Sequence, residues 1–122
     1  MANTGTIETI LRDEILGRVA GRLKIPVSEL LKPNRCERRT AEARQIAMYL
    51  LYNLNGKSLT RAGAVMNRDR TTVRYAVSKV ESSRRLSEMA SQILVSYKNA
   101  ASARIFDTTE RVDAPNPGQS SV

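Results

Sequence analysis

Several residue types that carry catalytic or metal chemistry are scarce or missing in this 122-residue chain. It has no His, no Trp and a single Cys, Cys36, which excludes a disulfide framework, a Cys/His zinc site and catalysis by an imidazole. The six Gly are scattered, and Gly56-Lys57-Ser58 lacks the upstream Gly of a phosphate-binding loop. We therefore expect no enzyme activity, no cofactor and no bound metal.

Long apolar segments are also missing. No apolar run approaches the roughly 20 residues that a membrane-spanning helix needs, and the first residues lack the basic start and apolar stretch of a signal peptide. The lone thiol fits a reducing compartment. These features predict a cytoplasmic protein without a membrane partner.

Positive charge is abundant and unevenly placed. Lys and Arg number 20 against 12 acidic residues, which gives a net charge of +8. Residues 1–32 carry a net +1 and residues 86–122 a net −1, so the segment 33–85 carries a net +8 by itself. Clustered positive charge favours a polyanionic partner, because binding releases the counterions around the polyanion.

Apolar residues recur every three or four positions in the first part of the chain, which predicts a helix over residues 6–23. Thr6 is of a type that caps helix N-termini, and Pro26 ends the pattern. Gly17 and Gly21 interrupt the helix, so either they allow close helix packing or the helix is broken near Gly17. The apolar positions are Ile7, Ile10, Leu11, Ile15, Val19 and Leu23.

A second long helix follows a short helical turn and a basic loop. The turn, PVSELL, is expected to place Leu30 and Leu31 against the core, and LKPNRCERRTAE forms the loop. Thr40 can cap the second helix, and Asn55-Gly56 supplies the residue types that end helices. Its inward stripe consists of Ala43, Ile46, Ala47, Leu50, Leu51 and Leu54.

The segment from Ser58 to Val80 predicts two helices separated by a tight turn. Ser58 can cap a short helix, SLTRAGAVM, Asn67-Arg68 forms the turn, and Asp69 can cap the helix that follows. This second helix has one apolar stripe and an opposite face rich in cationic and hydroxyl groups. Such a pair is typical of a helix-turn-helix. The expected buried positions are Leu59, Ala62, Val65, Met66, Val73, Ala76, Val77 and Val80.

C-terminal to this motif, the periodicity predicts one further helix over residues 86–97, whose apolar stripe is more typical of core than of an interface. The later residues are polar, and APNPGQSSV is typical of a disordered tail. We therefore predict an all-α protein with a compact helical domain. Its expected parts are a flexible N-terminus 1–5, a helical domain 6–98 with the helix-turn-helix at 58–81, and a largely disordered tail 99–122.

Three stretches in one order resemble the C-terminal DNA-binding domain of the bacterial replication initiator DnaA. They are RQIAMYL (44–50), SLTRAGAVMNRDRTTV (58–73) and AVSKV (76–80), and the resemblance extends from about Val19 to about Val80. It implies a helical domain, similar in fold to the Trp repressor, whose second helix enters the major groove of a duplex. An extra C-terminal helix would follow this domain.

The resemblance also implies roles for single residues. Asp69, Arg70 and Thr71 would approach base edges, whereas Thr72 and the Arg44-Gln45 pair would approach phosphates. An Arg of the basic loop would reach the minor groove; Arg35 is the nearest match by spacing, and Arg38 or Arg39 is the alternative because the loop is one residue longer. The full predicted DNA-contacting set is Arg35, Arg38, Arg39, Arg44, Gln45, Ser58, Thr60, Arg68, Asp69, Arg70, Thr71, Thr72, Arg74, Tyr75 and Lys79.

The chain departs from the family pattern in three ways. Arg70 stands where the family usually has His, and the turn at Asn67 lacks the usual paired glycines. The family's ATPase module has no counterpart in the sequence, so we expect a freestanding DNA-reading domain that forms no nucleotide-dependent filament. For Arg84-Arg85, a solvated surface is the favoured interpretation.

These features together predict a sequence-specific, double-stranded DNA-binding protein that regulates transcription, associated with the nucleoid when bound to DNA. Activation of a gene-transfer-agent or phage-like cluster is a special case of this role. Candidate protein partners are another transcription factor, a DNA-bending protein and a component of RNA polymerase. The alternatives are a replication regulator that competes for initiator sites and a protein-interaction adaptor. Scarce aromatic residues, one Phe and four Tyr, make RNA binding the weaker reading.

Overall fold

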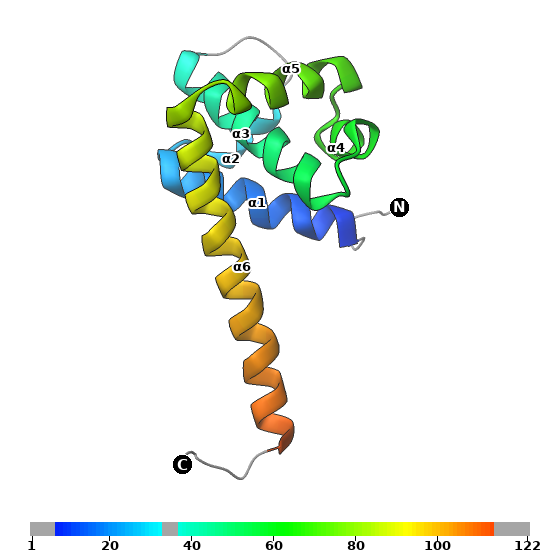
Figure 1. Cartoon of the computed structure of the whole chain (residues 1–122), viewed down its shortest axis with the longest axis vertical. Coiled ribbons are helices and arrows are strands. Elements are labelled where there is room, and N and C mark those ends of the chain that lie inside the picture. The colour runs from blue at the N-terminus through cyan, green and yellow to red at the C-terminus, as the bar shows by residue number, and fades with distance from the viewer. Residues whose placement is uncertain (1–6, 33–36, 114–122) are drawn as a thin grey trace.

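The computed structural model describes residues 7–32 and 37–113, and their side chains up to residue 103. The described residues form helices and turns without a strand, which confirms the predicted all-α class (Figure 1). The predicted cap Thr6, the N-terminus 1–5 and the loop residues 33–36 lie outside the described residues. The helices are α1 (Ile7–Leu23), α2 (Val27–Leu31), α3 (Arg38–Leu54), α4 (Leu59–Met66), α5 (Arg70–Glu81) and α6 (Arg84–Asp113).

Helix α1 runs without a break through both of its glycines. Neither alternative for these glycines holds, because an added Cβ at Gly17 or Gly21 would meet no atom within 4 Å. The first turn does not join the core as predicted: Ile7 is 83% exposed and Ile10 is 58% exposed. The buried part of α1 lies nearer its C-terminal end and consists of Ile15, Leu16, Val19, Ala20 and Leu23.

Two predictions near the basic loop are wrong. Leu30 is fully buried as expected, but Leu31 is 36% exposed, because the short helix α2 turns only one apolar side chain inward. Helix α3 begins at Arg38 after Glu37, which makes no side-chain capping bond, so Thr40 is a buried residue inside the helix and not its cap. Arg38 and Arg39 consequently lie in the first turn of a helix, outside the loop.

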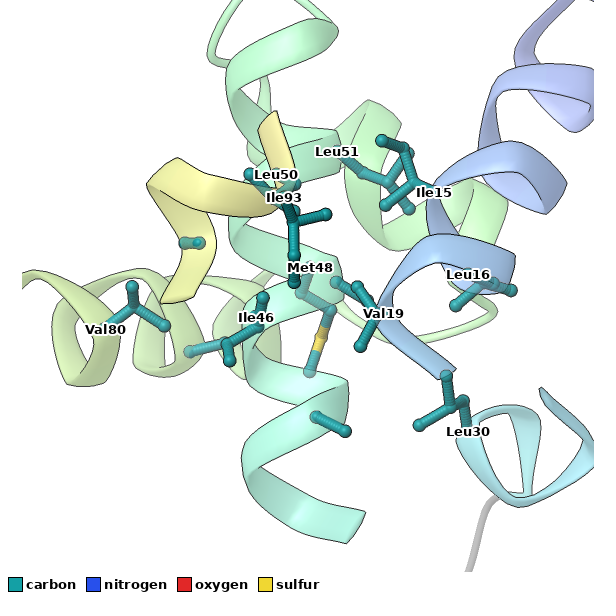
Figure 2. Packing of buried hydrophobic residues seen from close by; sticks show 14 of the residues in the cluster. Ile15, Leu16, Val19, Leu30, Ile46, Met48, Leu50, Leu51, Val80 and Ile93 are labelled. Atoms are coloured by element: carbon teal, nitrogen blue, oxygen red, sulfur yellow. The ribbon is translucent and has the colours of Figure 1, made fainter. Parts of the chain in front are cut away.

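Helix α3 is the centre of the core and contacts each of the other five helices. Its predicted stripe is buried, with Leu54 half-buried at the end. Figure 2 shows side chains from α1, α2, α5 and α6 gathered around those of α3. Burying a Leu or Ile side chain of this kind stabilises the fold by about 1.5–3 kcal/mol. The side chains labelled there are Ile15, Leu16, Val19, Leu30, Ile46, Met48, Leu50, Leu51, Val80 and Ile93.

The helix-turn-helix has the predicted limits and caps. Ser58 Oγ accepts a hydrogen bond from Arg61 N at 3.1 Å, and the C-cap of α4 is Asn67, whose left-handed backbone (φ 57°) forms the turn. Asp69 caps α5. The predicted stripe of α5 is buried, and in α4 Ala62 and Met66 are buried while Leu59 and Val65 are half-buried. These two helices therefore form as the sequence indicates.

Helix α6 is much longer than predicted. It covers Arg84–Asp113, so residues 99–113 are helical and the predicted domain end at residue 98 does not match the end of the helix. The predicted stripe packs as core at Leu86, Ala90 and Ile93, and the C-terminal half extends away from the other helices (Figure 1). At about 1.5 Å per residue the helix measures about 45 Å. Residues 114–122 lie outside the described part.

No helix among the residues that the structure describes has both the length and the apolarity to cross a bilayer.

Candidate DNA-binding surface

The exposed face of α5 and its flank carry two of the three predicted base-contacting side chains, Thr71 and Arg70. Its buried stripe faces α3 and α4, so Thr71, Tyr75 and Ser78 point the opposite way at about 100° of rotation per residue. Arg70 and Arg74 occupy one flank of this face. Every one of the predicted residues on α5 is exposed, namely Arg70, Thr71, Thr72, Arg74, Tyr75 and Lys79.

Asp69 fixes the N-terminus of this helix. Its Oδ1 accepts a hydrogen bond from Thr72 N at 2.8 Å. This bond from the backbone lowers the pKa of the Asp69 carboxyl, so the group is charged at neutral pH. The structure thus confirms the capping role, and the predicted contact to a base edge stays a prediction. An exposed carboxylate at this place can accept a hydrogen bond from cytosine N4.

The N-terminal end of α4 also carries polar groups. The Ser58 hydroxyl is used for capping, as the bond from Arg61 N shows. Thr60 and Arg61 are both exposed. Arg61 and Ser78, which the sequence-based assignment did not include, are exposed on α4 and α5. Arg61 occupies the third position after a cap, and Ser78 lies seven residues after Thr71 on the same face.

Two of the predicted DNA-contacting arginines donate to backbone carbonyl groups at the ends of α1 and α2. Arg39 Nη2 donates to Leu23 O, in the last turn of α1. Arg44 donates to Glu29 O through Nε at 3.2 Å and Nη2 at 2.7 Å. The last carbonyls of a helix lack partners within the helix and attract cations. These two arginines therefore hold the C-terminal ends of α1 and α2 against the start of α3.

Arg44 is only 8% exposed. Its position fits the packing of α2 on α3, and its contact with a phosphate stays a prediction.

Arg68 connects the turn of the helix-turn-helix to the beginning of the basic loop. Its Nη2 donates to Lys32 O at 2.6 Å, across 36 residues of sequence. This bond places Lys32, where the basic loop begins, beside the turn that precedes α5. Arg35 itself lies outside the described residues, so its predicted minor-groove contact stays a prediction.

A cavity of about 410 Å³ lies where the start of α3 meets the end of α5 and the start of α6. Gln45 and Lys79, two predicted DNA-contacting residues, are in its lining together with Arg38. Gln45 Oε1 is buried and makes no hydrogen bond within the described residues. The structure thus brings these three predicted residues together at one end of α5.

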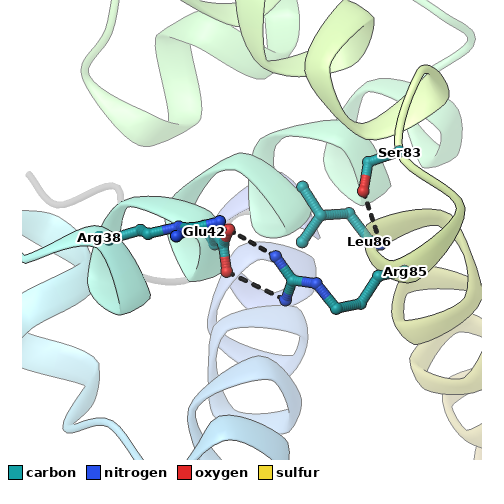
Figure 3. A network of polar contacts seen from close by, with 5 residues as sticks. All are labelled: Arg38, Glu42, Ser83, Arg85 and Leu86. Carbon is teal, nitrogen blue, oxygen red and sulfur yellow. Dashed lines mark hydrogen bonds and ion pairs between the residues drawn. The ribbon is translucent and has the colours of Figure 1, made fainter.

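An ion pair forms part of the same cavity. Arg85 donates to both carboxylate oxygens of Glu42, from Nη1 at 3.2 Å and from Nη2 at 2.7 Å (Figure 3). Arg38 Nε lies 3.4 Å from Glu42 Oε2. The Arg85 hydrogen bonds lower the pKa of the Glu42 carboxyl despite its burial, and they raise the pKa of Arg85. Arg84 and Arg85 are both exposed, as the expected solvated surface predicts, and the guanidinium of Arg85 is in addition paired with Glu42.

Comparisons with known proteins agree with this geometry. A family model described as the helix-turn-helix of the bacterial dnaA protein matches residues 12–80, which begins earlier than the expected Val19 and ends before α6. A chromosomal replication initiator protein DnaA from Rickettsia bellii is 43% identical over 70 residues, or 57% of this chain. The protein of the same description from Lachnoclostridium phytofermentans is 41% identical over 75 residues, or 61% of the chain. That from Clavibacter sepedonicus is 35% identical over 88 residues, again 61% of the chain.

These matches cover 15%, 16% and 18% of the respective relatives, so the shared part is a small fraction of each of those proteins.

Proposed function

Because the chain belongs to the family of bacterial DnaA helix-turn-helix domains, we propose that it binds double-stranded DNA sequence-specifically and regulates transcription. The observation that supports this most directly is α5: it is capped, held by its buried stripe, and exposed along the whole opposite face. A helix presented in this way suits insertion into a major groove.

The proposed DNA contacts fall into two groups, those to base edges and those to the phosphate backbone. The N-terminal side chains Arg70 and Thr71 are suited to base edges, where a guanidinium pairs best with guanine O6 and N7. Lys79 and Gln45, at the opposite end of α5, are suited to the phosphate backbone, which positions a protein without reading sequence. The loop that begins at Lys32 would approach the adjacent minor groove.

The direct test is selection from randomised duplexes with the full chain. Sequence-specific binding predicts enrichment of one short motif, related to the initiator's recognition sequence but not identical to it. Ser91→Ala is a suitable control variant because Ser91 is an exposed residue of α6, and it should enrich the same motif. Retention of all duplexes alike, or of none, would contradict the proposal.

The relatives' description as chromosomal replication initiators favours a second candidate, a regulator of replication that competes for initiator sites. Genome-wide occupancy of the tagged protein separates the two candidates. Binding upstream of genes, including a gene-transfer-agent or phage-like cluster, supports transcription regulation. Occupancy confined to a replication origin supports competition.

A further inference from the structure

Among the residues that the structure describes, Glu42 is the only acidic one in the lining of the cavity at the C-terminal end of α5. Its side chain is 12% exposed, and it faces the fork of Arg85, as Figure 3 shows. The lining also contains Arg38 and Lys79, so three cations surround one carboxylate. The position of Glu42 on α3 is fixed, because the side chains next to it on the inner face belong to the core.

The two arginines remain accessible while they contact Glu42. The side chain of Arg85 is 55% exposed and that of Arg38 is 86% exposed. A bidentate arginine–carboxylate pair is among the stronger polar contacts, and an Arg binds a phosphate with the same geometry. A DNA phosphate and the Glu42 carboxylate would therefore be alternative partners for the same guanidinium.

We infer that Glu42 limits the sequence-independent part of DNA binding, by holding Arg85 and drawing Arg38 away from the phosphates that pass the end of α5. The inference rests on the proposed DNA binding. Of the cations in the lining, Lys79 is the one for which no bond to Glu42 is found among the described residues. The carboxylate thus determines how many positive charges this end of the surface contributes.

The physical consequence is a specific kind of change in Glu42→Gln. Each additional phosphate neutralised makes the slope of log affinity against log salt steeper by about 0.9. We expect the slope to steepen by about one to two units. Affinity should rise by a similar factor for the preferred duplex and for an unrelated one, because phosphates carry no sequence information.

A matched control is available on α6. Glu88 is exposed and has no ion-pair partner among the described residues, and Glu88→Gln changes the net charge by the same amount. We expect it to leave the salt slope close to that of the wild type. The double variant Glu42→Gln/Arg85→Ala should lose most of the gain, because the released guanidinium is then missing.

The experiment measures duplex affinity across a salt series for the wild type and these variants, with a thermal melt for each. Equal slopes for Glu42→Gln and Glu88→Gln would overturn the inference, as would weaker binding by Glu42→Gln. Should Glu42→Gln fail to fold, the salt slope of Arg85→Gln is decisive. A slope flatter than that of the wild type by about one unit would show that Arg85 already contacts a phosphate, and this would overturn the inference. If the wild type bound no duplex in a salt-dependent way, the proposed function itself would fail.

Discussion

Arg44 and Arg70 are residues of one type in one small domain, yet their guanidinium groups have opposite surroundings. Arg44 is almost fully buried against the Glu29 carbonyl, whereas Arg70 is exposed at the first position of α5. A count of positive charge along the sequence treats the two alike. It could not separate them, because the carbonyl that binds Arg44 lies 15 residues away in sequence, at the end of another helix.

Arg44→Ala should therefore destabilise the fold, since it leaves a carbonyl at the end of α2 without its donor. We expect a loss of about 1–3 kcal/mol in the free energy of unfolding. Denaturant titration measures it, and Arg70→Ala is the matched control, which should change stability little. Equal stability of Arg44→Ala and the wild type would show that this contact contributes nothing.

Arg70 should instead govern which sequence is bound. Arg70→Ala is expected to cost about 1–3 kcal/mol on the preferred duplex and to reduce discrimination at one base pair. Lys79→Ala should weaken binding to all sequences nearly alike, because a phosphate contact carries no base information. Selection from randomised duplexes with the wild type and Arg70→His tests the assignment. Identical enriched sites would mean that Arg70 contacts only the backbone.

The Glu42–Arg85 pair should make stability depend on acid pH. The folded-state pKa of Glu42 lies below its ordinary value, so the pair contributes stability above that ordinary value and loses it as the pH falls through the lowered one. The melting temperatures of the wild type and Glu42→Gln should therefore differ at neutral pH and converge in acid. A gap that stayed constant across this range would contradict the linkage.

At the scale of elements, side-chain caps explain which helix limits could be predicted. Ser58 and Asp69 bond to the backbone of the helices that they begin, and both starts agree with the sequence. Glu37 makes no such bond. The sequence therefore predicts Thr40 as the cap of α3, whereas the helix already begins at Arg38. The extension of α6 was missed because its Ala-rich residues 100–103 favour a helix without giving an apolar period.

The turn between α4 and α5 depends on a glycine in α4. Arg68 N donates to Gly63 O at 2.8 Å, and a Cβ on Gly63 would lie 2.5 Å from Arg68 O. Gly63→Ala should thus displace the turn and cost about 1–3 kcal/mol by overpacking. Gly17→Ala is the matched control: nothing lies within 4 Å, and the helix should gain roughly 0.5–1 kcal/mol. Equal melting temperatures of the two variants would exclude this role.

At the scale of the whole molecule, the net charge of +8 in residues 33–85 does not say which of its cationic side chains point toward a duplex. Arg39, Arg44 and Arg68 donate to backbone carbonyls, and Arg85 is paired with Glu42. The cations of α5 face outward. Composition thus indicated the class of partner, while the assignment of each cation required the folded chain.

The last prediction concerns how much of the chain the fold needs. Among the described side chains, the buried positions of α6 end at Ile93, and the helix continues to Asp113 away from the other helices (Figure 1). A chain ending at residue 98 should therefore keep its melting temperature and its duplex affinity, while its helical signal falls by the share of residues 99–113.

A chain ending at residue 85 should melt at a much lower temperature, because it loses Leu86, Ala90 and Ile93 from the core. Removal of one such Leu or Ile side chain alone typically costs about 2–5 kcal/mol. Circular dichroism melts of the two truncated chains beside the full chain measure both effects. If the chain ending at residue 98 also lost stability, the extended half of α6 would have a packing role in solution, and the domain would include it.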